Sequence, residues 1–344
     1  MRSPVAVSSP SAIALSRRSR PSPADAARDP PAAPCRHGRR GDGRGHERPA
    51  RPPRLLAGAH AELRGRGEQR RDRAGAPGGR ASWVSLLGDD PLGDLIAREL
   101  RAEGVAVHAP LRSGRPTGIM HKHRRTTGMT TVSFWRAGSA ASRLTPADVP
   151  DALLATADVV HLTGILAGLG PDSLACAQDT ARRARAVGAR VSFDVNHRTA
   201  LWRGRDAGAA YRDLAAAADV LFAGEEEAAI LVGAGTPGEL AERLRALGPR
   251  EVVIKRGAAG AFADDGCDRL DLPAVAVDAV DTVGAGDAFV AGYLSLRPEE
   301  APLAERLRRA VAAGAFACLS SGDWEGAPTA AELARLGEEE GVLR

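Results

Sequence analysis

The chain has 344 residues, of which 44% are hydrophobic, 26% are charged and only 3% are aromatic. This length allows one large domain or two modest domains with a hydrophobic core. No run of about 18 or more apolar residues occurs, so we expect no membrane-spanning helix and no membrane partner. The scarcity of aromatic residues argues against a nucleic-acid surface built on base stacking.

The formal net charge of +4 combines two parts of opposite sign. Residues 1–80 contain 18 Arg and 7 acidic residues, whereas the other 264 residues carry more acidic than basic side chains. The basic character therefore belongs to one segment, and the remainder is not of nucleic-acid-binding type. The four cysteines lie far apart without a C-x-x-C pair, which predicts reduced thiols in a cytoplasmic protein.

Residues 1–80 differ from the rest of the chain and leave two interpretations open. They contain 11 of the 23 prolines and no Phe, Trp or Tyr. Such a composition is typical of a disordered basic tail. An organelle transit peptide fits less well, because such peptides are amphipathic and this segment consists largely of Gly, Pro and Arg.

The second interpretation is that residues 36–78 are translated out of frame. From Arg36 to Arg80, every residue type has codons that can begin with G or C, and the chain uses 45 Arg against 2 Lys, as a GC-rich gene would. With suitable synonymous codons, residues 66–74 read one base later give G-E-S-N-V-A-I-G, which resembles a strand followed by a helix start. On this interpretation residues 1–35 are upstream sequence.

From residue 81 the sequence takes on α/β character. We expect a strand over 81–87, a helix from Pro91 that ends at Gly104, and a strand over 105–108. Residues 117–136 form two extended pieces around residues 124–128, which predicts a hairpin-like excursion.

Strands and helices then alternate. The expected strands are 159–162, 190–194, 220–223, 251–255 and 261–264, and the expected helices are 171–187, 207–217, 225–231, 237–247, 287–296, 303–319 and 330–336. Strands joined by helical crossovers predict a mostly parallel sheet that is covered on both faces.

The strongest chemical signal is residues 281–289, D-T-V-G-A-G-D-A-F, at the start of a predicted helix. Its small residues expose backbone N–H groups at the positive end of the helix dipole, which is an arrangement that binds anions. Asp287 could then accept a proton from a hydroxyl group that attacks a phosphoryl group. The alternative is that Asp287 is an ordinary helix-capping residue.

The 281–289 string resembles the signature of the ribokinase-like (PfkB) carbohydrate kinases, and the resemblance covers residues 81–344. It implies an α/β three-layer sandwich with a mostly parallel sheet and a small β lid, the lid piece being about 105–140. It implies ATP-dependent phosphorylation of a sugar hydroxyl, with Asp287 as general base and Gly284, Ala285 and Gly286 as the anion hole. Family lids often mediate dimers, so a homo-oligomer is expected by analogy. The resemblance further implies that Lys255, Gly257, Gly260 and Thr282 contact the nucleotide.

Within the family, four strings are similar to the branch of 2-keto-3-deoxygluconate kinases: residues 115–118, 134–140, 193–198 and 322–326. The resemblance implies that Arg136 holds a substrate carboxylate and that Asp323 bonds substrate hydroxyls. It also implies that Arg198 and Asn196 lie near substrate and phosphates. A guanidinium group presents a planar fork that suits carboxylate and phosphate.

Two departures from this branch bear on the substrate and the metal. Met120 and Phe134 stand where the branch usually has tyrosines, which removes two phenol donors. The N-x-x-E motif tied to magnesium and phosphate binding begins here with Gly224, although Glu227 is kept. We therefore expect Mg²⁺ to be held through water and phosphates, with no direct protein ligand assigned.

Three other features have plainer interpretations. Residues 233–238 match G-x-G-x-x-G, which would predict a dinucleotide-binding dehydrogenase, but Pro237 in a first helical turn favours a helix stop, a turn and a helix start. The basic cluster 121–125 is either an anion contact or a solvated hairpin. His161 is expected to be a core or switch-point residue and not a metal ligand.

The sequence thus predicts a kinase that uses ATP and Mg²⁺ on 2-keto-3-deoxygluconate or a similar sugar acid. Two alternatives remain open. One is a kinase of a neutral sugar such as fructose. The other is a catalytically defective kinase fold that lacks a core strand and the substrate segment near its N-terminus.

Overall fold

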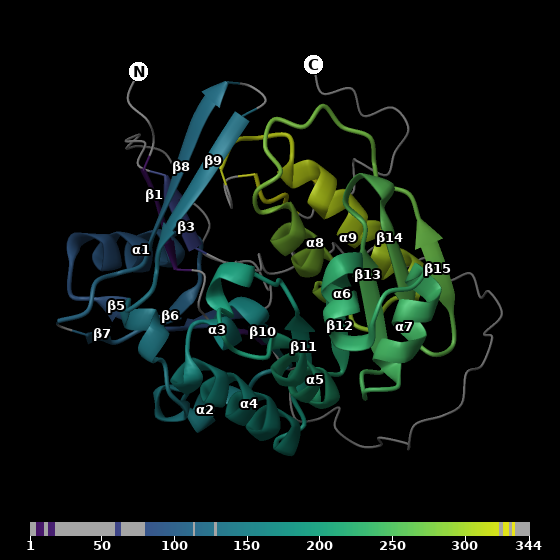
Figure 1. The fold of residues 1–344 in the computed structure, drawn as a ribbon, viewed down its shortest axis with the longest axis horizontal. Helices are drawn as coiled ribbons and strands as arrows, with labels where there is room; N and C mark the ends of the chain where they lie inside the picture. Colours follow the sequence, from purple (N-terminus) through teal and green to yellow (C-terminus); the bar gives the residue numbers. More distant parts are fainter. Residues whose placement is uncertain are drawn as a thin grey trace, which may run out of the picture.

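The computed structural model describes residues 5–9, 13–17, 59–62, 80–112, 114–126, 129–322, 326–329 and 332–333. These residues form a mixed sheet with helices on both faces and a smaller sheet that projects beside it (Figure 1). Among the described residues, no helix combines the length and the apolar character that crossing a bilayer requires. The expected α/β sandwich is confirmed.

The large sheet has nine strands, and its middle is parallel. Strands β10 to β13 lie side by side in one direction, as βαβ connections require. Strands β14 and β15 extend it antiparallel at one edge. The order is β15 (Arg269–Leu272), β14 (Ala261–Asp264), β13 (Glu251–Lys255), β12 (Val220–Gly224), β11 (Arg190–Asp194), β10 (Val159–Thr163), β2 (Ile13–Arg17), β4 (Arg80–Val84) and β6 (Ala106–His108).

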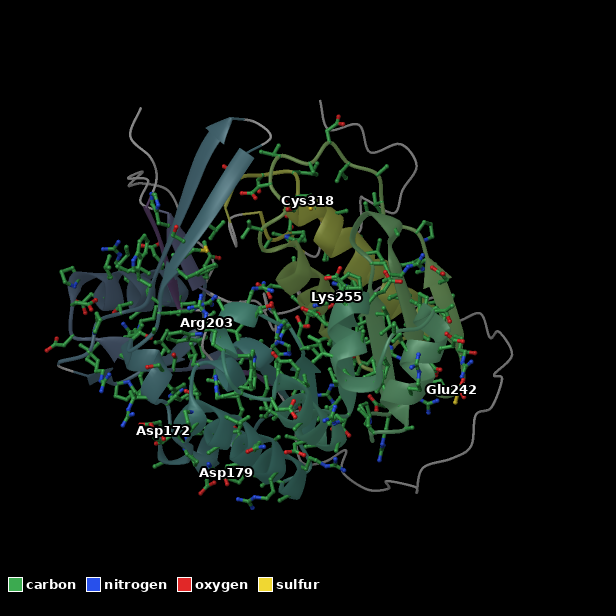
Figure 2. All side chains as sticks on the ribbon, viewed as in Figure 1. Asp172, Asp179, Arg203, Glu242, Lys255 and Cys318 are labelled. Atoms are coloured by element: carbon green, nitrogen blue, oxygen red, sulfur yellow. The ribbon has the colours of Figure 1, made fainter. Side chains whose placement is uncertain are left out.

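Helices cover both faces of this sheet. One face packs against α2 (Asp151–Leu154), α3 (Gly164–Gly168), α4 (Pro171–Ala186), α5 (Ala207–Ala217), α6 (Glu225–Val232) and α7 (Pro237–Arg245). The other packs against α1 (Pro91–Ala102), α8 (Ala285–Leu294) and α9 (Leu303–Ala317). The outer surface of α4 carries Asp172 and Asp179 (Figure 2), which pair with Arg143 and Arg183.

Local sequence explains where these helices begin. The Asp90 side chain accepts a hydrogen bond from the Gly93 amide at 2.8 Å, and proline occupies the first turn of α1. Thr236 and Glu239 form a capping box at the start of α7. Gly233, with φ of 77°, ends α6. A helix therefore precedes the 233–238 string, and the dinucleotide-binding alternative, which needs a strand there, is wrong.

Strand β2 was not expected from the sequence. It lies between β10 and β4 and runs antiparallel to both. Ala14 and Leu15 are buried, and Leu15 packs with Val84 and Val160 in the main core. The sheet is thus continuous across this position, so the expectation that a core strand would be missing is wrong. The rest of the 1–80 segment lies outside the described residues. The out-of-frame interpretation stays a prediction about the coding DNA.

The smaller sheet contains the expected hairpin. Strands β8 (Ile119–Thr126) and β9 (Met129–Trp135) pair antiparallel, and β1 (Val5–Ser9) and β3 (Ala59–Glu62) extend the sheet beyond β8. A two-residue pair, β5 (Leu87–Gly88) with β7 (Leu111–Arg112), lies near its base. Side chains of the basic cluster after His121 lie outside the described residues. A lid role for this sheet stays a prediction.

Two further expectations are tested by burial and bonding. His161 is 3% exposed, and its Nδ1 lies 3.0 Å from the Ser192 hydroxyl, so it is a core residue as expected. Cys176 and Cys318 are free thiols. Cys267 is disulfide-bonded, so the expectation of four reduced cysteines is wrong.

Candidate active site

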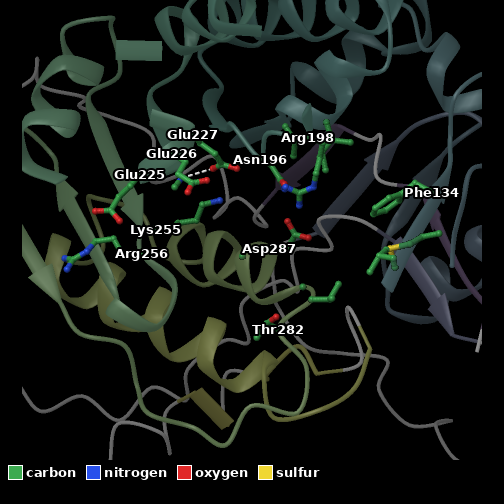
Figure 3. A pocket seen from close by; sticks show the side chains of 18 of the residues that line it. Phe134, Asn196, Arg198, Glu225, Glu226, Glu227, Lys255, Arg256, Thr282 and Asp287 are labelled. Atoms are coloured by element: carbon green, nitrogen blue, oxygen red, sulfur yellow. Dashed lines mark hydrogen bonds between the residues drawn. The ribbon is translucent and has the colours of Figure 1, made fainter. Parts of the chain in front are cut away.

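A cavity of about 780 Å³ opens where the parallel strands end and helix α8 begins (Figure 3). Thr163, Asp194, Gly224 and Lys255 are the last residues of β10, β11, β12 and β13. The carboxyl ends of parallel strands are where α/β proteins bind ligands. Of the residues predicted for the site, the cavity lining includes Met120, Phe134, Arg136, Asn196, Arg198, Glu227, Lys255, Thr282, Gly284, Gly286 and Asp287.

The remaining predicted residues behave differently. Ala285 lies between two lining residues in the first turn of α8. Gly257 and Gly260 are absent from the lining. A Cβ on Gly260 would lie 2.0 Å from the Leu272 carbonyl oxygen, so this glycine is needed for close strand packing. Asp323 lies outside the described residues.

Helix α8 presents free amides to the cavity. Gly284 has φ of 82°, a left-handed conformation that favours glycine, and it turns the chain into the helix. The Ala285 amide donates to the Thr282 carbonyl at 3.3 Å, whereas no side chain caps the helix. Among the described residues, the amides of Gly286 and Asp287 meet no hydrogen-bond acceptor. This helix end therefore suits an anion.

Asp287 has an unusual electrostatic environment. Desolvation by burial and the negative charge of Asp194 raise its pKa to about 7, against the opposing effect of Lys255 and Arg198. A carboxylate with a pKa near neutrality is suited to taking up a proton during a reaction. Because Asp287 is the third residue of α8, its carboxylate lies beside the free amides.

Lys255, which lines the cavity, forms an ion pair with the buried Asp194. The Lys255 amino group lies 2.6 Å from Oδ1 and 2.9 Å from Oδ2 of Asp194. The Asp194 side chain is 1% exposed and the Lys255 side chain 18% exposed. Burial alone would lower the pKa of Lys255, but Asp194, Glu227 and Asp287 together raise it above its usual value. The ammonium group therefore keeps its charge.

The loop after β11 is held by Glu227. Its carboxylate accepts hydrogen bonds from the His197 amide at 2.9 Å and from the Gly224 amide at 2.7 Å. Asn196 has φ of 34° and is the one non-glycine residue with positive φ within the described part of the chain. Glu227 thus fixes a strained turn that directs Arg198 into the cavity (Figure 3).

The far wall of the cavity combines an apolar surface with a buried cation. Met120 and Arg136 are 2% and 6% exposed. The Arg136 guanidinium lies 4.0 Å from the centre of the Phe134 ring. Desolvation and the neighbouring Arg198 lower the pKa of Arg136 to about 10. No salt bridge joins Arg136 to a carboxylate of the described residues. Arg198 lines the same cavity, and its charge acts on both Arg136 and Asp287.

Sequence reasoning did not single out Asp194, Thr163 or Arg256 for this site. Their common signal was their place at or just after the end of a predicted strand. Within the residues that the structure describes, no group of three or more His, Cys, Asp or Glu side chains is arranged to hold a metal ion. The exposed carboxylates Glu225 and Glu226 do line the cavity, and they suit a Mg²⁺ ion that keeps its water shell.

Comparison with known proteins places this cavity in a family context. The family model described as pfkB family carbohydrate kinase matches residues 73–330. The 2-dehydro-3-deoxygluconokinase of Bacillus subtilis (strain 168) is 36% identical over 75% of this chain and 81% of its own length. The enzyme of the same name from Thermoproteus tenax is 38% identical over 75% of this chain and 80% of its own length.

Solved structures agree with this placement. A PfkB protein from Polaromonas sp. JS666 superposes with a TM-score of 0.63 at 34% identity, covering 69% of this chain and 79% of that chain. Aminoimidazole riboside kinase from Salmonella enterica, solved with aminoimidazole riboside and an ATP analogue, gives a TM-score of 0.63 at 27% identity, covering 74% and 85%. The chain therefore belongs to the pfkB family of carbohydrate kinases, and it is a phosphotransferase that acts on a sugar hydroxyl.

Proposed function

We propose that this kinase transfers the γ-phosphoryl group of ATP to a hydroxyl of 2-keto-3-deoxygluconate or a similar sugar acid. The observation that carries the proposal is Arg136, a buried cation that lines the cavity beside Arg198 and forms no salt bridge with a carboxylate of the described residues. Two cations at the apolar wall suit a substrate that is both anionic and partly deoxygenated. The names of the two curated relatives support the same substrate class.

The geometry supports a simple reaction path. The sugar hydroxyl gives its proton to the Asp287 carboxylate as its oxygen forms a bond to the γ-phosphorus. The bond from that phosphorus to the bridging oxygen breaks, and ADP leaves. The amides of Gly286 and Asp287 hold the negative charge on the phosphoryl oxygens.

The residues of the cavity also fit a magnesium-bound nucleotide. The free amides of α8 and the cations Lys255 and Arg198 can donate hydrogen bonds to phosphate oxygens, while Glu225, Glu226 and Glu227 face the same space. When bound, Mg²⁺ neutralises phosphate charge and polarises the phosphoryl group. Glu227 acts on this region through the loop that it holds, since both its oxygens are engaged by backbone amides.

The test is a panel of acceptors with wild-type protein and Arg136→Ala, assayed by ADP release. We expect wild type to use 2-keto-3-deoxygluconate with a higher kcat/KM than fructose or ribose. Loss of the guanidinium should lower kcat/KM for the sugar acid by about 30–100-fold, because a charge-assisted bidentate contact disappears. For neutral sugars the change should stay within about threefold.

Either of two results would contradict this substrate. Equal losses for acidic and neutral sugars would mean that Arg136 does not bind a carboxylate. A higher kcat/KM for a neutral sugar would favour the alternative that the missing phenols at Met120 and Phe134 suggest. A relative supports this neutral-sugar alternative. It is the "Probable fructokinase-4" of Arabidopsis thaliana, which is 30% identical over 75% of this chain and 82% of its own length.

A further inference from the structure

The ion pair between Lys255 and Asp194 leaves part of the lysine free. An ammonium group has three N–H donors and no acceptor. The two Asp194 oxygens, at 2.6 Å and 2.9 Å, use at most two of these donors, and no other acceptor for Lys255 occurs among the described residues. At least one N–H therefore remains for an oxygen atom of a ligand.

The position of this free donor is well defined. Lys255 closes β13 and lines the cavity, and its amino group points into it between Glu227 and Asp287 (Figure 3). Its charge also acts on the Asp287 carboxylate. The side chain of Asp194 is almost fully buried, and its carboxylate holds the Lys255 amino group in place. The lysine is thus fixed in position with one side open toward the reacting centre.

Another ion pair shows what a purely structural arrangement looks like in this sheet. Arg190 opens β11 at the opposite end from Asp194, and its side chain is 18% exposed, the same as Lys255. Its Nη2 lies 2.8 Å from Oε1 of Glu251, which is 8% exposed. Neither residue of this pair lines the cavity. In both pairs a cation with the same exposed fraction bonds to a buried carboxylate, and the pairs differ in whether the cation lines the cavity. Glu251 also accepts hydrogen bonds from Arg306 and Tyr293.

We propose that Lys255 is a catalytic residue that binds the transferred phosphoryl group, and that Asp194 is the positioning residue that aims it. The inference rests on the proposed phosphoryl transfer but not on the identity of the sugar. During transfer the lysine N–H donates to a γ-phosphoryl oxygen while that phosphorus bonds to the sugar oxygen and releases ADP. The sugar proton passes to Asp287, and Lys255 stays protonated throughout. Its fixed charge offsets the negative charge of the phosphoryl oxygens in the transition state.

The experiment compares Lys255→Met, Lys255→Arg and Asp194→Asn with the matched control Arg190→Met. For each protein we would measure kcat and KM for ATP, and the thermal midpoint. Lys255→Met should lower kcat by about 100-fold or more, the usual effect of removing one donor to a transition-state charge, with KM for ATP changed by less than about fivefold. Lys255→Arg should recover part of kcat. Arg190→Met should lower the thermal midpoint and leave kcat near the wild-type value.

A binding measurement gives a readout that is independent of turnover. ADP with Mg²⁺ is titrated calorimetrically with and without aluminium fluoride, a mimic of the phosphoryl group in transfer. Wild type and Arg190→Met should bind ADP more tightly when the fluoride is present. Lys255→Met should lose most of this gain, Asp194→Asn part of it, and Lys255→Arg should keep part of it.

The pH dependence of kcat/KM provides the second independent readout. Lys255 lowers the pKa of Asp287 and Asp194 raises it. The acid limb should therefore move to higher pH in Lys255→Met and to lower pH in Asp194→Asn. A merely structural pair would lower stability in both variants without these opposite shifts.

The inference fails if Lys255→Met and Arg190→Met have the same kcat, or if Lys255→Met keeps the gain from aluminium fluoride. If Lys255→Met does not fold, Lys255→Arg decides instead. A kcat near zero in Lys255→Arg, together with a gain from aluminium fluoride equal to that of wild type, would overturn the inference. Failure of the proposed substrate looks different: wild type then turns over a neutral sugar only, and the same variant series is measured with that sugar. In that case the fluoride gain still decides the role of Lys255.

Discussion

At the scale of single residues, Asp287 illustrates how the fold tunes a carboxylate. Its position in the first turn of α8 places it beside unpaired amides, while burial and Asp194 oppose its ionisation. The opposing cations Lys255 and Arg198 keep the pKa from rising further. The result is a pKa of about 7, which is far better matched to proton uptake than that of an exposed aspartate.

Replacing Asp287 with Asn should separate catalysis from stability. Turnover should fall by at least about 1,000-fold because the base is lost, while ATP binding measured by calorimetry should survive. At pH 8 the variant should also melt at a temperature higher by about 2 °C or more, since a charge that the fold disfavours is removed. Retained turnover would show that another group takes the sugar proton.

The acid limb of the pH profile should report the same carboxylate. Asp287 acts as a base only when ionised, so kcat/KM should rise with pH up to about 7 and then level off. The sign for stability is the reverse. A carboxyl with a raised folded pKa contributes its stability at pH below its unfolded value, and loses it as pH rises through about 7. A profile flat from pH 5 to 8 would contradict this assignment.

At the scale of elements, the anion-binding end of α8 depends on how that helix packs. Helix α8 lies on α9 at a close crossing, where a Cβ on Gly292 would meet the Ala313 Cβ and the Arg309 carbonyl oxygen, each at 2.8 Å. Tyr293 packs edge-on against Phe222 of β12. The helix that carries the general base is thereby tied both to its partner helix and to the sheet.

Strand β2 is the element whose contribution is easiest to measure. Leu15→Ala should lower the free energy of unfolding by about 2–5 kcal/mol, because Leu15 is 3% exposed within the main core. Leu111→Ala is the matched control. Leu111 is 48% exposed, so its loss should change the free energy of unfolding by less than about 0.5 kcal/mol. Urea titration gives both values, and equal effects would mean that β2 does not belong to the core.

At the scale of the whole molecule, the sequence predicted most elements from residue 81 onward. Patterns of apolar residues gave the parallel strands and their crossover helices to within a few residues. Glycine and proline marked helix ends such as Gly233 and Pro237. Strand β15 was not predicted, because its alternation of exposed and half-buried residues covers only Arg269–Leu272. Strand β2 was not predicted because its five residues lie in an Arg- and Pro-rich segment.

The site could be predicted in part. The 281–289 string predicted the N-terminus of α8 and the position of Asp287 there, because the helix start and this residue are adjacent in sequence. The Asp194–Lys255 pair was not predicted, since it joins residues 61 positions apart and depends on the register of three strands. Likewise, the stacking of Arg136 on Phe134 depends on the rotamers of side chains two residues apart.

The coding DNA should settle the origin of the N-terminal segment. If residues 36–78 are out of frame, resequencing across codons 30–85 should reveal a one-base insertion or deletion near each end of the segment. The corrected frame would then supply the G-E-S-N-V-A substrate segment, and the defective-kinase alternative would lapse. A confirmed frame would make the basic segment part of the protein, and low turnover of the purified chain would then favour that alternative.

The place of β2 has a consequence for the order in which the chain acquires its structure. The strand leaves the ribosome before both of its neighbours, and β10 is made long after it. Because both neighbouring strands are synthesised after β2, this strand cannot be protected from a protease by pairing until they have been made. Contacts between residues so far apart in the sequence also form slowly. Strands β10 to β13 contact one another through short crossovers, so they can assemble first. Strand β2 should therefore gain protection from a protease later than β10 to β13 during refolding.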